Sequence, residues 1–105
     1  MADIDDDLRN RIVTEFKNDV ERHLARLRDA QAHVDDSAFE KATHGLKGVA
    51  GTFGASELSR LSAQANTMNR QGKVDEAFAM TSEIETHATA VLYSVDDLFP
   101  SRTEA

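Results

Sequence analysis

Apolar residues recur every three or four positions along nearly the whole chain, and this period constrains the fold more than any other feature of the sequence. The clearest stripe comprises Leu8, Ile12, Phe16, Val20, Leu24 and Leu27. The alternating, β-branched runs that indicate strands do not occur in the sequence. The pattern therefore predicts an all-α protein in which each helix buries one face.

Four helical segments with short connections are expected, over about residues 5–32, 37–54, 56–72 and 74–98. A short extra helix is allowed at the N-terminal end of the first segment. Ser37 and Glu40 have the spacing of a capping box, and Gly54 suits a left-handed helix end. Phe99-Pro100 ends the last helix, because proline cannot continue it. We expect an antiparallel four-helix bundle that forms a single domain over residues 1–105, with its core over about residues 5–99 and a flexible tail over 100–105.

The composition argues against several classes of function. The formal net charge of −7 disfavours nucleic acid and an anionic membrane as partners. The sequence has no cysteine and no histidine pair with the spacing of a helical zinc site, so no metal site is expected. It also lacks a signal-peptide pattern, and no stretch approaches the ~20 apolar residues that span a bilayer. We expect a cytoplasmic protein, and a monomer, because a complete bundle needs no partner to fold.

Glycines are concentrated in the second helical segment, around His44. Gly45, Gly48 and Gly51 lie inside this helix, where each costs about 1 kcal/mol relative to alanine. At about 100° per residue, His44 points away from the apolar side, and Gly48 and Gly51 lie within about 40° of it. The apolar side is expected to comprise Phe39, Ala42, Leu46, Val49 and Phe53. We therefore expect an outward-pointing imidazole on a helix face cleared of side chains, whereas Gly45, nearer the flank, could instead allow close helix packing.

Two lysines flank His44 on the same helix. Lys41 and Lys47 each lie three residues away, which is a spacing at which helical side chains are neighbours. Their charge favours a neutral imidazole, whose lone pair is the nucleophile, and would stabilise an arriving phosphoryl group. The arrangement suits attack on a phosphoryl group that another molecule holds in place.

The segment His44-Gly45-Leu46-Lys47-Gly48, followed by Gly54, resembles the signature of histidine-containing phosphotransfer (HPt) domains. Leu58 and Leu61 also fall where that family has core leucines in the next helix. The resemblance implies a helical bundle in which His44 receives a phosphoryl group from the aspartate of one receiver domain and passes it to another. It further implies that Lys47 and Gly48 support this histidine.

The same resemblance implies a polar side chain from the third helix that orients the imidazole, and either Gln64 or Asn66 could serve. The expected partners are receiver domains of response regulators and of hybrid histidine kinases. Mg²⁺ is expected on the receiver, and this chain itself is expected to need no cofactor. The docking surface is expected to include Lys41, Gly45, Gly51 and Arg60.

Two other functions were weighed against phosphotransfer. The first is a helical interaction module that docks receiver or other domains and leaves His44 unused. The second is a helical enzyme with His44 as a general base, although no second catalytic group lies at a telling spacing. A kinase is not expected, because the sequence has no glycine-rich nucleotide loop.

Overall fold

The computed structural model describes the backbone over residues 2–98 and the side chains over residues 7–95. Within this part of the chain there are helices and turns but no strand. The helices are α1 (Ala2–Ala32), α2 (Asp36–Thr52), α3 (Ser56–Arg70), α4 (Val74–Ala79) and α5 (Thr81–Leu98). The predicted all-α fold is confirmed.

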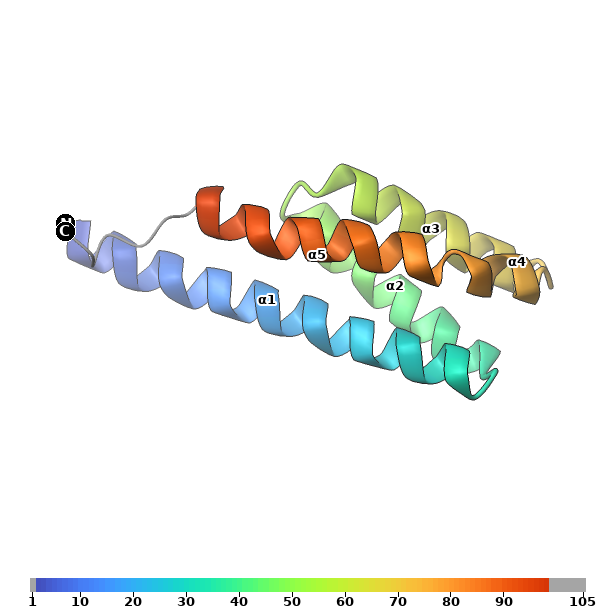
Figure 1. Cartoon of the computed structure of the whole chain (residues 1–105). Helices are drawn as coiled ribbons and strands as arrows, with labels where there is room; N and C mark the ends of the chain where they lie inside the picture. The colour runs from blue at the N-terminus through green and yellow to red at the C-terminus, as the bar shows by residue number, and fades with distance from the viewer. Residues whose placement is uncertain (1, 99–105) are drawn as a thin grey trace.

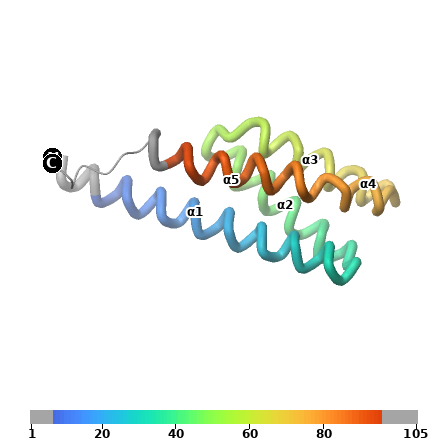
Figure 2. Tube along the Cα trace, in the orientation of Figure 1, coloured from blue at the N-terminus to red at the C-terminus, as the bar shows by residue number. Residues whose placement is uncertain are grey.

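The helices form an antiparallel bundle in which α4 and α5 together occupy the fourth position (Figure 1). α1 packs against α2 and α5, while α3 packs against α2, α4 and α5. The tube in Figure 2 shows the same up-and-down course. The bundle is elongated, with principal extents of 51 × 22 × 18 Å.

The fourth segment is interrupted at Met80, where a single continuous helix was expected. The Met80 N–H bonds to the carbonyls of Ala77 and Phe78, which tightens the turn. The ring of Phe78 packs on that of Phe39, with centroids 4.7 Å apart. α4 can therefore follow the end of α3, while α5 returns along both α1 and α3.

The N-terminal part of α1 differs from the sequence prediction. α1 is one continuous helix, so no separate short helix precedes it. Leu8 and Ile12 were expected in the core but are 53% and 40% exposed. The reason is length, because α1 extends past the turn that joins α2 to α3 (Figure 2).

Phe16 marks the level at which α1 enters the core. It is buried, and its ring lies 4.3 Å from the ring of Phe53, measured between centroids. Phe53 was expected to be buried, but it ends α2 and remains 37% exposed. The expected helix end at Phe99-Pro100 and the expected tail lie outside the described residues.

Three helices end in the same way. Each of Val34, Gly54 and Gly72 has a positive φ, and each ending shows the paired backbone hydrogen bonds of a Schellman motif. At the first ending, for example, Asp35 N–H bonds to the Ala30 carbonyl at 2.9 Å. The left-handed end predicted at Gly54 is confirmed.

The start of α2 is capped differently from the prediction. The Asp35 side chain accepts a hydrogen bond from the Ala38 N–H at 3.0 Å, which makes Asp35 the N-cap. Ser37 therefore lies inside the helix, and the expected capping box with Glu40 is wrong. Asp35 rather than Ser37 caps the helix because it stands one residue before the first helical turn. Its carboxylate also interacts favourably with the positive end of the helix.

Candidate functional site

His44 lies in the middle of α2, on the side that faces solvent. The opposite side is buried and comprises Phe39, Ala42, Thr43, Leu46 and Ala50. Among the described residues His44 has no hydrogen-bond partner, and its side chain is exposed. The predicted outward orientation of the imidazole is confirmed.

The backbone beside His44 is open at Gly48 and Gly51. A Cβ built on Gly48 would have no neighbour within 4 Å, and one on Gly51 would make only an ordinary contact of 3.6 Å with Ser59 Oγ. Packing within the bundle therefore requires glycine at neither position. The glycines expose the helix face on either side of the histidine.

Gly45 has a different role from the other two glycines. A Cβ at this position would lie within 3.0 Å of three ring atoms of His23, which approaches from α1. The close helix packing considered for Gly45 is therefore present. The imidazole of His23 on α1 packs against the backbone of α2 at Gly45, where it leaves no room for a side chain. Nothing in the sequence pattern pairs these two residues, because they lie on different helices.

Two shallow hollows flank His44, and they differ in character. The first, here called the α1 hollow, has a volume of about 470 Å³ and is lined by Asp19, His23, His44, Gly45, Gly48, Val49, Thr52 and Phe53. The second, the α3 hollow, has a volume of about 380 Å³ and is lined by Ser37, Glu40, Lys41, His44, Asn66 and Arg70. His44 thus stands between a depression whose surface is largely apolar and one that is lined by polar and charged residues.

The α3 hollow brings a third cation to the site. Lys41 and Lys47 are exposed on α2, as expected. Arg70 reaches the same hollow from α3, and its Nε lies 3.8 Å from Glu40 Oε2. The sequence analysis missed Arg70, since only the packing of α3 against α2 brings it near His44.

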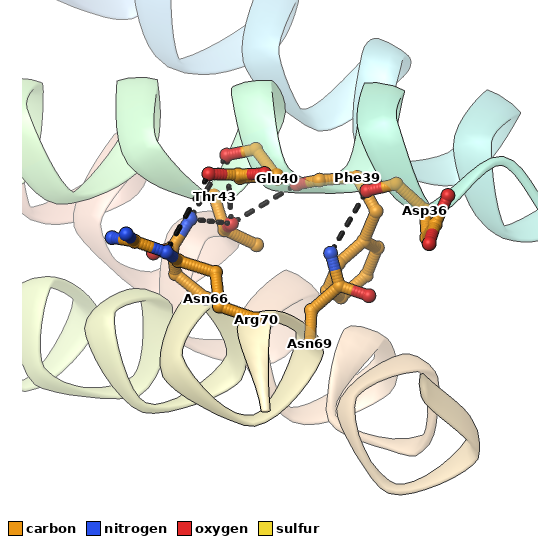
Figure 3. A network of polar contacts seen from close by, with 7 residues as sticks. All are labelled: Asp36, Phe39, Glu40, Thr43, Asn66, Asn69 and Arg70. Carbon is orange, nitrogen blue, oxygen red and sulfur yellow. Dashed lines mark hydrogen bonds and ion pairs between the residues drawn. The ribbon is translucent and has the colours of Figure 1, made fainter. Parts of the chain in front are cut away.

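The two amides predicted to orient His44 are bonded elsewhere. Asn66 Nδ2 donates to the Glu40 carbonyl and to Thr43 Oγ1, both at 3.0 Å (Figure 3). Gln64 Oε1 accepts from Arg60 Nη1 at 3.3 Å. Neither amide therefore has a hydrogen bond to His44 through which to orient it.

Asn66 belongs to a polar seam that joins α2 to α3. Asn69 Nδ2 donates to the Asp36 carbonyl at 2.8 Å, one turn further along the same interface (Figure 3). Thr43 is fully buried and donates to the Phe39 carbonyl at 3.0 Å. Buried polar groups of this kind are costly unless paired, so the seam fixes the position of α2 against α3. It thereby holds the helix that carries His44.

Arg60, expected on the docking surface, is an exposed residue of α3 with partners of its own. Its Nε donates to Glu57 Oε1 at 3.1 Å. This hydrogen bond lowers the pKa of the Glu57 carboxyl from its ordinary value. Arg60 therefore presents a paired charge rather than a bare cation.

The described residues give no sign of two other kinds of site. No three metal-ligating side chains come together among them. Within the same range no helix is both long and apolar enough to cross a lipid bilayer.

The fold and the site define a helical bundle that presents one unpaired, exposed histidine on an open helix face. A comparison with known families matches residues 11–93 to the Hpt domain, and the chain belongs to this family. Hpt domains are phosphotransfer modules of phosphorelays rather than kinases, and they generally interact with receiver domains. No curated protein and no solved structure matches the chain.

Proposed function

We propose that this protein carries a phosphoryl group on His44, which it accepts from the aspartyl phosphate of one receiver domain and passes to the aspartate of another. The observation that carries the proposal is the exposed His44 side chain, which has no partner among residues 7–95, next to a Gly48 whose Cβ position is empty. A donor held by a second protein can reach such a ring without displacing any side chain of this one.

The transfer itself is a simple exchange of bonds. The lone pair of the unprotonated ring nitrogen attacks phosphorus, and the bond between phosphorus and the aspartate oxygen breaks. The electron pair of that bond leaves with the carboxylate, while the other ring nitrogen keeps its proton. The second transfer is the reverse reaction with a different receiver.

The cations around His44 support the charged group during both steps. Lys41 and Lys47 lie about one turn before and after it on α2, and Arg70, whose charge is shared with Glu40 at 3.8 Å, lines the α3 hollow. Phosphoryl transfer depends mainly on positioning and on the stabilisation of charge on the transferred oxygens. In this proposal the metal ion comes with the receiver, and this chain contributes the nucleophile and the three cations.

The experiment uses receiver domains from the source organism, each phosphorylated on its aspartate with labelled phosphate in the presence of Mg²⁺. The wild-type protein should acquire acid-labile label from at least one receiver. His44→Gln should lose the label, while His33→Gln, which changes an exposed histidine at the end of α1, should keep it. Label that persists in His44→Gln would refute the proposal. Receiver binding without any label would instead support the interaction module.

A further inference from the structure

We propose that His23 is a specificity-determining residue, whose ring, seated on Gly45, shapes the α1 hollow to receive an apolar side chain of the docking receiver. The inference rests on the proposed function, because it concerns the partner that reaches His44. It assigns to α1 a part in recognition that the signature around His44 does not contain.

The contact between His23 and Gly45 is the first argument. The imidazole lies so close to the backbone of α2 that any Cβ at position 45 would meet three of its atoms within 3.0 Å. The ring therefore occupies the place where every other amino acid would have a side chain. This place is directly beside His44 in the sequence and in the wall of the same hollow.

The state of the His23 ring is the second argument. Its Nδ1 is buried and has no hydrogen-bond partner in the part of the chain that the structure describes, so a proton on this atom would have no acceptor there. Burial lowers the pKa of His23 from its ordinary value, and the charges of Arg22 and Arg26 lower it further, against the opposite effect of Asp19. The ring thus forms an uncharged, flat wall that is held by packing.

The position of the hollow identifies its occupant. His44 is one of its lining residues, so a protein that brings phosphorus to bonding distance of His44 must also cover the hollow. Val49 and the partly exposed ring of Phe53 make its lining largely apolar. An apolar side chain of the receiver suits this lining. The α3 hollow is lined by Lys41 and by the pair of Arg70 with Glu40, and it therefore suits the polar, phosphate end of the same partner better than an apolar side chain.

The test measures how the rate of transfer to His44 depends on the concentration of a phosphorylated receiver. His23→Ala should raise the half-saturating concentration about tenfold, while the maximal rate stays within about twofold, because the ring shapes docking rather than chemistry. His23→Phe, which retains a flat ring, should recover most of the loss. His33→Ala is the control and should match the wild type.

Gly45→Ala tests the pair from the other side. The added methyl group must displace the His23 ring, so the half-saturating concentration should rise by a similar factor. In a protein that already carries His23→Ala, the same change should add less than about twofold, because contacting residues are not additive.

Labelling of His44 by phosphoramidate, a small donor that needs no docking, distinguishes a loss of docking from general damage to the protein. A loss of docking leaves this labelling unchanged, whereas damage to the fold around His44 lowers it. The labelling should be equal in the wild type and all variants. Unchanged concentration dependence in a folded His23→Ala protein would overturn this inference alone. A wild-type protein that phosphoramidate labels but no receiver does would refute the proposed function, and this inference with it.

Discussion

Val34 has a backbone conformation that its side chain disfavours. Its φ is 51°, and among the described residues it is the non-glycine residue with a positive φ. A β-branched residue in this region is strained, whereas the equivalent positions in the next two turns are Gly54 and Gly72. The turn after α1 therefore has a strained valine at the position where the turns after α2 and α3 have glycine.

We expect Val34→Gly to raise the free energy of unfolding by about 1 kcal/mol, since it removes this strain and Val34 is 70% exposed. Urea denaturation measures the change. Gly54→Val, the reverse substitution at an equivalent position, should lower stability by at least a similar amount. A neutral or destabilising Val34→Gly would contradict the account.

A second prediction for a single residue concerns His23 and pH. Because burial lowers its pKa in the folded protein, the unfolded chain binds the proton more readily. The stability that comes from the neutral ring is therefore present above the unfolded pKa of about 6.5 and is lost as the pH falls below it. The urea concentration at the midpoint of denaturation should be lower at pH 5.5 than at pH 7.5, and this difference should be smaller in His23→Phe. Equal differences in the two proteins would argue against a buried neutral ring.

At the scale of the element, α2 carries glycines that its packing does not require. Gly48→Ala should raise the free energy of unfolding by about 1 kcal/mol, because the methyl group meets nothing and the helix gains propensity. Gly48→Gln should also leave the protein folded. It should slow transfer from a phosphorylated receiver about tenfold or more, because the long side chain crowds the approach to His44. Unchanged transfer in a stable Gly48→Gln protein would count against the open face as the basis of function.

The helices themselves could be predicted from the sequence because their apolar period is strong and glycines mark the ends of α2 and α3. The details of where a helix is capped or interrupted could not be predicted, because they depend on competition between neighbouring residues and on packing. Asp35 caps α2 although Ser37 and Glu40 match the capping pattern, and the break at Met80 follows from packing. The outward direction of His44 follows from the wheel alone. The contributions of His23 and Arg70 do not, since they come from other helices.

At the scale of the molecule, the periodic pattern shows which side of α1 is apolar but not how far its neighbours extend. Leu8 and Leu27 belong to the same stripe, yet the first is 53% exposed and the second is completely buried. Leu27→Ala should lower the free energy of unfolding by about 2–5 kcal/mol, whereas Leu8→Ala should change it by less than about 0.5 kcal/mol. Both values come from urea denaturation. A large loss for Leu8→Ala would show that the described burial understates its packing.

Among the described residues nothing is hydrogen-bonded to the His44 side chain, and this has a consequence for the proposed relay. A side chain that holds nothing together can be modified without releasing anything, so the loaded and empty forms of the protein would have the same shape. Two forms of equal shape offer each receiver surfaces that differ by the phosphoryl group alone, and no change of fold is available to favour one receiver over the other. The net direction of phosphoryl transfer would then be governed by mass action, that is, by the amounts of phosphorylated and unphosphorylated receiver of each kind.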